Sequence, residues 1–366
     1  MTTQQFISPA RDLNDFWDWY ELALKEGWTD GLPVCPPTEE RVGAIIDYLK
    51  RDPQEVIGII DPQKGVATVE QVAINCAMAG CTPAMVPVVI ASIQAMLESE
   101  FSLHGVQCTT NPCAPLTIVN GPIAQELGFN GKEGCFGGGS RANVTVGRAV
   151  RLILWNIGGG IPGETDMATI GGSAKLAFCV AENESDSPWT LLHEERAGMS
   201  REQNAVTVFA CQSPDPLFVP GDSNRILKIL AASLPTPGVN MFHTGGQYLL
   251  AMSSKVAQEL DRGGYTKEAL KDWLWQNARY NVGWMKQSGI LVEGESHQYY
   301  WGHGMENAPN LETLPDSAMV PMVGTPEDIH ILVAGGDSQW WIGFCAGWGA
   351  YGGYAVTMPI VLPGAD

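Results

Sequence analysis

The amino-acid sequence predicts an α/β protein made of two related halves, with a site between them. Amphipathic helical patterns alternate with short apolar runs that are typical of buried strands. This alternation predicts helices packed on sheets. The 366 residues are enough for a large core, and 45% hydrophobic with 17% charged residues is an ordinary balance for a folded domain.

The second observation is an internal similarity. When the chain is shifted by 133 residues, His104–Leu127 aligns without a gap on Pro237–Leu260. Leu116 then meets Leu249, and both segments end in Ala-Gln-Glu-Leu. Coincidence is the alternative, because these four residues are common in helices. The shared order of helix, loop, strand and helix favours a duplicated α/β unit with a pseudo-twofold relation between its copies.

Residues 1–66 are expected to form a region of helices and loops. An amphipathic pattern from Asp12 onward has a capping residue at Asp12 or Asn14. Thr38, directly after two prolines, starts a second helical pattern in the manner of a capping box. Residues 57–62 are apolar and predict a short strand.

The two halves are expected at residues 67–198 and 199–366. In the first half we predict apolar helices at 68–80 and 83–99, a buried strand at 114–122, helices at 123–127 and 140–155, and a strand at 175–183. In the second half we predict strands at 205–211, 246–252 and 328–336 and helices at 223–234, 253–260 and 266–280, followed by an aromatic-rich C-terminal segment.

Charge and cysteine content indicate the setting. The formal net charge of -19 argues against a nucleic-acid partner or an anionic membrane surface. No apolar run reaches the ~18 residues of a membrane span, and the N-terminus lacks the basic and apolar regions of a signal peptide. Nine cysteines without a CxxC pair predict mostly buried free thiols and a cytoplasmic protein.

Two glycine triplets, Gly137–Gly139 and Gly158–Gly160, flank the predicted helix at 140–155. Bare backbone before a helix exposes amides to an anion, so Ser140 and Arg141 suggest a carboxylate or phosphate site. A tight turn packed under another element is the alternative. No nucleotide-binding motif is present, so no cofactor is assigned. The substrate-binding candidates are Thr109, Thr110, Asn111, Asn120, Gly138, Gly139, Ser140, Arg141 and Asn156.

Under the pseudo-twofold relation, the loop 108–113 would face the loop 241–246. His243 in the second loop is the candidate acid or base, because the pKa of histidine lies near neutrality. Glu164 and Cys81 are further catalytic candidates, although loop acids are commonly solvated and buried thiols inert. Weak candidates for a metal site follow the strand at 175–183: Glu182, Glu184 and His193.

Several segments together resemble a widespread, poorly characterised microbial family whose members often lie near small UGSC-motif (seleno)proteins. They are "WTDGLPVCPPTEERV", "ATVEQVAINCAMAGCTPAMVPVVIASIQAML", "TTNPCAPLTIVNGPI", "SRANVTVGRAVRLILWNIGGGIPGETDMATIG" and "AENESDSPWTLLHEERAG", and they cover most of residues 28–198. The resemblance implies thiol-linked or selenium-linked chemistry and a small thiol or selenol partner protein.

Taken together, the sequence predicts a soluble, homo-oligomeric enzyme that acts on a small polar or anionic metabolite. Lyase, hydrolase and redox chemistry all remain open, because motifs such as GxSxG and HExxH are absent. The alternative is a non-catalytic binding or scaffold subunit, for which the twelve tryptophans could supply an interface.

Overall fold

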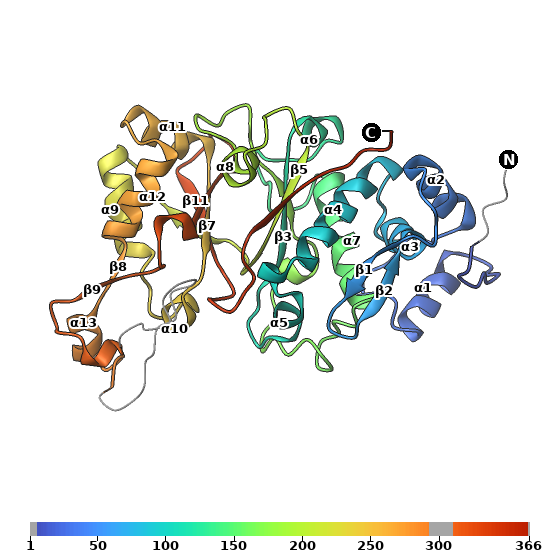
Figure 1. The fold of residues 1–366 in the computed structure, drawn as a ribbon, viewed down its shortest axis with the longest axis horizontal. Coiled ribbons are helices and arrows are strands. Elements are labelled where there is room, and N and C mark those ends of the chain that lie inside the picture. The colour runs from blue at the N-terminus through green and yellow to red at the C-terminus, as the bar shows by residue number, and fades with distance from the viewer. Residues whose placement is uncertain (1–5, 293–309, 365–366) are drawn as a thin grey trace.

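The computed structural model describes residues 6–292 and 310–364, and the predicted α/β class is confirmed (Figure 1). Within the described residues the strands form two four-stranded sheets and two two-stranded sheets. Each four-stranded sheet mixes parallel and antiparallel pairs.

The first sheet is centred on β3 (Ala114–Asn120). β3 is parallel to β4 (Cys179–Ala181) and antiparallel to β5 (Ala205–Cys211). β5 pairs on its other side with β12 (Val356–Pro359), which is antiparallel to it. The strand order is therefore β12-β5-β3-β4.

The second sheet has the corresponding arrangement around β7 (Tyr248–Met252). β7 is parallel to β10 (Ile329–Val333) and antiparallel to β11 (Trp341–Ala346). β11 pairs in turn with the antiparallel β6 (Asp215–Phe218). One edge strand of each sheet follows directly, along the chain, a strand of the other sheet. β6 of the second sheet follows β5 of the first, and β12 of the first sheet follows β11 of the second.

A hydrophobic cluster lies between the two sheets. Leu116 on β3 and Leu249 on β7 both belong to it and are fully buried. Ile118 and Val180 join from the first sheet, and Leu332 joins from the second. β5 pairs with β3 of the first sheet, so the domain boundary expected at residue 199 would divide that sheet.

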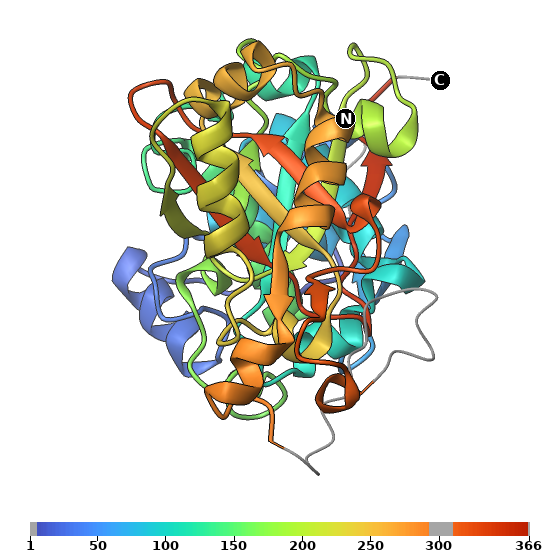
Figure 2. The ribbon, with the colours of Figure 1, turned by 90° about the vertical axis from the view of Figure 1, so that its left-hand side faces the viewer.

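Helices cover the outer faces of both sheets. α4 (Val86–Leu97) packs against β5 and β12, and α7 (Arg141–Asn156) packs against β4. On the second sheet α12 (Lys267–Asn277) packs against β10, and Figure 2 shows the helices of this half in front of its strands. The other long helices are α1 (Phe16–Lys25), α2 (Glu39–Leu49), α3 (Val69–Ala79), α9 (Ser223–Ser233) and α11 (Ser254–Arg262).

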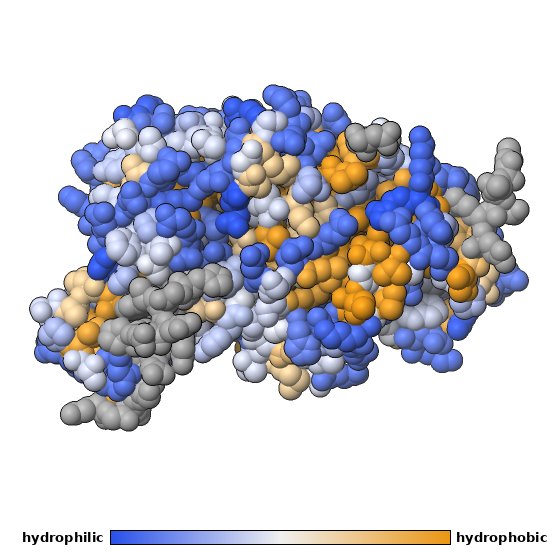
Figure 3. All heavy atoms as spheres, in the orientation of Figure 1, coloured by the Kyte–Doolittle hydropathy of each residue, from blue (hydrophilic) through white to orange (hydrophobic). Residues whose placement is uncertain are grey.

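The remaining elements are short. They are α5 (Leu103–Cys108), α6 (Pro122–Glu126), α8 (Leu192–Ala197), α10 (Met241–Thr244), α13 (Val282–Gln287), β8 (Arg279–Asn281), β9 (Met319–Pro321) and the hairpin β1 (Val56–Ile60) and β2 (Gly65–Thr68). The hairpin exposes Val56, Ile59 and Val66. Figure 3 shows apolar surface on this side of the molecule, over the half that contains β1 and β2.

Side-chain caps fix several helix starts. Thr38 caps α2 by accepting from the Arg41 amide, but the third helical position is Arg41, so the expected capping box does not form. α1 is capped by Asp15 instead of Asp12 or Asn14. Ser140 caps α7 by accepting from the Asn143 amide. Over the described part of the chain, no single helix is long and apolar enough to cross a membrane; α3 and α4 together would be, but they are bent by 119°.

Candidate functional site

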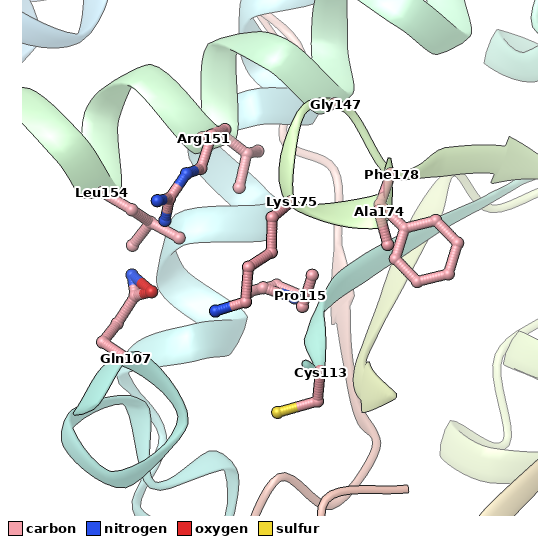
Figure 4. A pocket seen from close by; sticks show the side chains of 11 residues that line it. Gln107, Cys113, Pro115, Gly147, Arg151, Leu154, Ala174, Lys175 and Phe178 are labelled. Carbon is pink, nitrogen blue, oxygen red and sulfur yellow. The ribbon is translucent and has the colours of Figure 1, made fainter. Parts of the chain in front are cut away.

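A small pocket opens at the amino ends of β3 and β4. Four polar side chains point into it from different elements: Gln107 from α5, Cys113 before β3, Arg151 from α7 and Lys175 before β4 (Figure 4). Its volume is about 10 Å³, close to the least space that one water needs. The pocket therefore has room for a single oxygen atom of a ligand.

The carboxylate of Asp166 holds the two cations in place. Lys175 Nζ donates to both of its oxygens at 2.9 and 2.8 Å, and Arg151 Nη2 lies 3.5 Å from one of them. Arg151 also donates to the carbonyl of Gly160 at 3.0 Å. All three charged side chains are almost completely removed from solvent. Two cations thus share one carboxylate, which leaves a net positive charge in the buried cluster.

Gln107 brings an unused hydrogen-bond donor to the same pocket. The residue is 2% exposed, and its Nε2 atom is buried without a hydrogen-bond partner. A Cβ atom on Gly160 would lie 3.2 Å from this nitrogen. The second glycine triplet therefore supplies the close approach that this wall of the pocket requires. A buried donor without an acceptor costs about 1–3 kcal/mol, so a ligand oxygen here would be stabilised.

Cys113 contributes a neutral thiol. Burial raises its pKa to about 12, while the nearby Lys175 ammonium acts in the opposite direction. The thiol is therefore a weak donor and a weak nucleophile at neutral pH. Burial also lowers the pKa of Arg151, against the effect of Asp166.

The loop 109–112 connects this pocket to the rest of the molecule. Asn111 Oδ1 accepts from the Cys113 amide at 2.8 Å, and the carbonyl of Thr110 accepts from the Thr169 amide at 3.0 Å. Trp348, from the second half of the chain, donates to Thr109 Oγ1 at 2.9 Å. The three loop residues expected to bind substrate thus border the pocket but do not line it.

The glycine loop before α7 lies elsewhere. Arg141 and Arg151 are ten residues apart on one helix, which separates their Cα atoms by ~15 Å. The Arg141 guanidinium donates twice to the carbonyl of Gly80, at 3.2 and 2.9 Å. Gly138 and Gly139 are exposed, and Ser140 is the helix cap. These residues do not belong to the pocket.

The other expected substrate contacts are also placed apart. Asn120 lies at the far end of β3 and donates to Glu182 and Glu184 at 2.7 and 3.0 Å. Asn156 donates to Asn75 Oδ1 and to the carbonyl of Trp28, next to a different cavity.

None of the three catalytic candidates lines the pocket. His243 lies exposed on α10 with its ring edge-on to Phe242. Cys81 is buried where α3 meets α4, and its thiol donates to the carbonyl of Thr145 at 3.4 Å. Glu164 is exposed in the turn that leads to Asp166.

The expected metal site needs correction. No group of three or more His, Cys, Asp or Glu side chains that could hold a metal ion occurs among the described residues. Glu182 accepts instead from Asn120 and from the Leu192 amide, and His193 Nε2 bonds to the carbonyl of Ser200 at 3.1 Å. Both donors bond to Oε2 of Glu182, whereas its buried Oε1 has no hydrogen-bond partner, and burial raises the pKa of the carboxyl group.

Sequence reasoning missed Gln107, Arg151 and Lys175. Arg151 carried a usable signal, because it falls on the same helical face as the buried Gly147 and Leu154. A cation on the apolar face of an amphipathic helix needs a buried partner. Gln107 and Lys175 gave no comparable signal in the sequence.

Comparison with known proteins gives no relative for this chain. No family model, no curated protein and no solved structure matches it.

Proposed function

We propose that this chain is an enzyme that acts on a small metabolite carrying a carboxylate or phosphate group. The anionic group would place one oxygen among Gln107, Arg151 and Lys175, and the rest of the metabolite would lie at the mouth of the pocket. Small-molecule sites combine such a few convergent polar groups with an otherwise apolar lining, as Pro115, Leu154 and Phe178 supply here.

The unpartnered Nε2 of Gln107 is the observation that carries this proposal. It is a buried donor beside two cations that share a single carboxylate. Each feature alone has a structural explanation. Together, however, Gln107 Nε2 lacks a hydrogen-bond acceptor, and the two cations lack a second negative charge. A ligand oxyanion would supply both.

We further propose that the two halves are duplicated units related by a pseudo-twofold axis. The matching strand order and strand directions of the two sheets support this, as does the placement of Leu116 and Leu249 on the central strands. The contact between Trp348 and Thr109 would place the mouth of the pocket where the halves meet. The neutral Cys113 thiol would connect the pocket to the sulfur-linked chemistry that the resemblance implies.

A second candidate is a binding or scaffold subunit. Phe218 on β6 and Trp341 on β11 are each 47% exposed, with ring centroids 4.9 Å apart. β6 is an edge strand of its sheet, so a partner could add to it there.

Titration calorimetry with phosphate, sulfate and acetate at constant ionic strength tests the enzyme's anion site. Wild-type protein should bind at least one of these anions. Gln107→Leu and Lys175→Met should each weaken binding by roughly 10-fold to 100-fold, as expected for a hydrogen bond to a charged group.

Lys132→Met is the matched control, because Lys132 is half exposed and pairs with Asp186 on the surface. It should bind as wild type does. Equal binding by all four proteins, or none by wild type, would contradict the anion site. If the anion site is confirmed, a metabolite screen followed by a co-crystal structure would identify the substrate.

A further inference from the structure

A second and much larger cavity lies in the N-terminal region. It is a groove between α1, α2 and α3 with a volume of about 830 Å³. Trp19, Trp28, Ile74 and Met78 give it an apolar lining, to which Asn156 adds a polar side chain. Small-molecule sites commonly have volumes of ~300–1,000 Å³. The groove thus has the size and lining of a ligand site, and it shares no residue with the pocket at Lys175.

A cation from the chain itself already lies on the aromatic wall. The guanidinium carbon of Arg11 is 5.4 Å from the centroid of the Trp28 ring. The Trp19 ring is 6.0 Å from that of Trp28, at an angle of 31°. Positive charge over a tryptophan face is attracted by the negative face of the ring. This wall is therefore suited to a cationic group.

The ion pair that holds the Arg11 side chain in place is weak. This side chain is 49% exposed, and its ion pair with Glu26 is long, at 3.7 Å. Exposed ion pairs of this kind contribute little to stability. Another cation could therefore displace the guanidinium at small cost.

The charge of the lining favours the same kind of ligand. Asp12, Asp15, Glu39 and Glu70 all line the groove, against Arg11 as its one basic residue in the described part of the chain. Glu70 accepts from the amides of Ile7 and Ser8 and so fixes the segment that carries Arg11. Asp12 and Glu39 bring negative charge to the lining. With a net charge of -19, the whole chain also attracts cations.

We propose that this groove binds a small organic cation with an apolar body, such as a quaternary ammonium compound. The cationic group takes the face of Trp28, the apolar body contacts Ile74 and Met78, and Arg11 holds the cation position while the ligand is absent. The site is independent of the anion pocket, so either proposal can fail without the other.

Choline is a suitable probe, and 3,3-dimethyl-1-butanol is its uncharged isostere. Titration calorimetry should show choline binding roughly 10-fold more tightly than the isostere, because only the cation interacts with the ring charge. Trp28→Leu keeps an apolar wall and should abolish that preference. Equal binding of the two probes to wild type, or no binding of choline, would overturn the proposal.

Arg11→Ala provides the sharper test, because it removes the competing guanidinium from an exposed position. It should raise the affinity for choline several-fold. Arg41→Ala is the matched control, since Arg41 is exposed on α2 and is not part of the lining. If both variants raise the affinity equally, the gain comes from net charge alone and Arg11 does not occupy the site.

Discussion

Lys175 donates to both carboxylate oxygens of Asp166, and neither side chain has appreciable contact with solvent. The lysine precedes β4, whereas the aspartate ends a turn that the second glycine triplet begins. Figure 4 shows the Lys175 ammonium on the side of the pocket that Gln107 also lines. The carboxylate therefore fixes the two cations, Arg151 and Lys175, of the proposed anion site.

Asp166→Asn should lower the free energy of unfolding by about 3–5 kcal/mol, because it leaves two buried cations without their counter-charge. Urea unfolding measures the change. Phosphate should recover part of the loss, since an anion in the pocket replaces the missing charge. Asp186→Asn removes a surface partner of Lys132 and should cost less than about 1 kcal/mol. Similar losses in the free energy of unfolding of the two variants would show that the charge of Asp166 does not stabilise the two cations.

The two glycine triplets should differ sharply in their tolerance of alanine. A Cβ atom on Gly158 would lie 2.6 Å from the carbonyl oxygen of Asp61 and 2.7 Å from that of Leu154. Gly158→Ala should therefore cost about 1–3 kcal/mol or more through overpacking. Nothing lies within 4 Å of the corresponding position on Gly138. Gly138→Ala should stay within about 0.5 kcal/mol of wild type. Thermal unfolding of both variants tests this difference. Similar losses in stability would show that close packing does not distinguish the second triplet from the first.

Local patterns in the sequence predicted the central strands well. β3, β5, β7 and β10 are apolar runs between turn residues, and each lies where it was expected. Six strands were missed: β2, β6, β8, β9, β11 and β12. β6 is exposed at an edge, and β11 lies in a tryptophan-rich segment without strict alternation. β12 pairs with a strand about 150 residues earlier, and no local signal indicates such a partner.

The site was harder to predict than the fold, because it depends on side chains brought together from four elements. Arg141 matched the pattern of an anion site, yet its guanidinium caps the end of α3 through Gly80. Arg151, two to three turns later on the same helix, faces the pocket. Helical spacing places Arg151 on the same face as Gly147 and Leu154, but it does not show which side chains from other elements pack against that face.

His330 should make stability depend on pH. It is buried on β10, where its Nε2 lies 2.9 Å from Gln247 Oε1 and its Nδ1 lies 3.4 Å from Arg196 Nη1. Burial, together with Arg196, Lys271 and Lys267, lowers its pKa well below the usual 6.5. These contacts fit a neutral ring that donates from Nε2 and accepts at Nδ1.

Below about pH 6.5 the unfolded chain binds a proton at this histidine that the folded chain does not. The free energy of unfolding should therefore fall on acidification, by up to about 1.4 kcal/mol per pH unit. Urea unfolding between about pH 5 and pH 7.5 should show a flatter profile for His330→Gln. An unchanged slope in His330→Gln would assign the pH dependence to other groups.

Thiol titration should separate two cysteines from the other seven. All nine are free; Cys35 and Cys108 are partly exposed, and the rest are buried, including the catalytic candidate Cys81. A disulfide reagent should modify about two thiols in the native protein and nine after denaturation. Cys108 should react slowly at neutral pH, because burial and the charges of Asp61 and Asp166 raise its pKa. Intact native disulfides would contradict the cytoplasmic location that the sequence predicts.

The pairing of β12 with β5 predicts a long-range effect of truncation. Val356 pairs with Val208 and Met358 with Val206, and Val356 and Ile360 belong to the same core cluster as α3 and α4. Removing residues 354–366 should therefore expose the edge of β5, far from the cut in sequence. Hydrogen exchange should show faster exchange at the β5 amides that face β12, while β7 and β10 keep their protection. Removal of residues 363–366 alone should leave both sheets protected. If the longer truncation instead speeds exchange first at β7 and β10, then β12 mainly stabilises the second sheet. Its pairing with β5 would then contribute little to the stability of the first sheet.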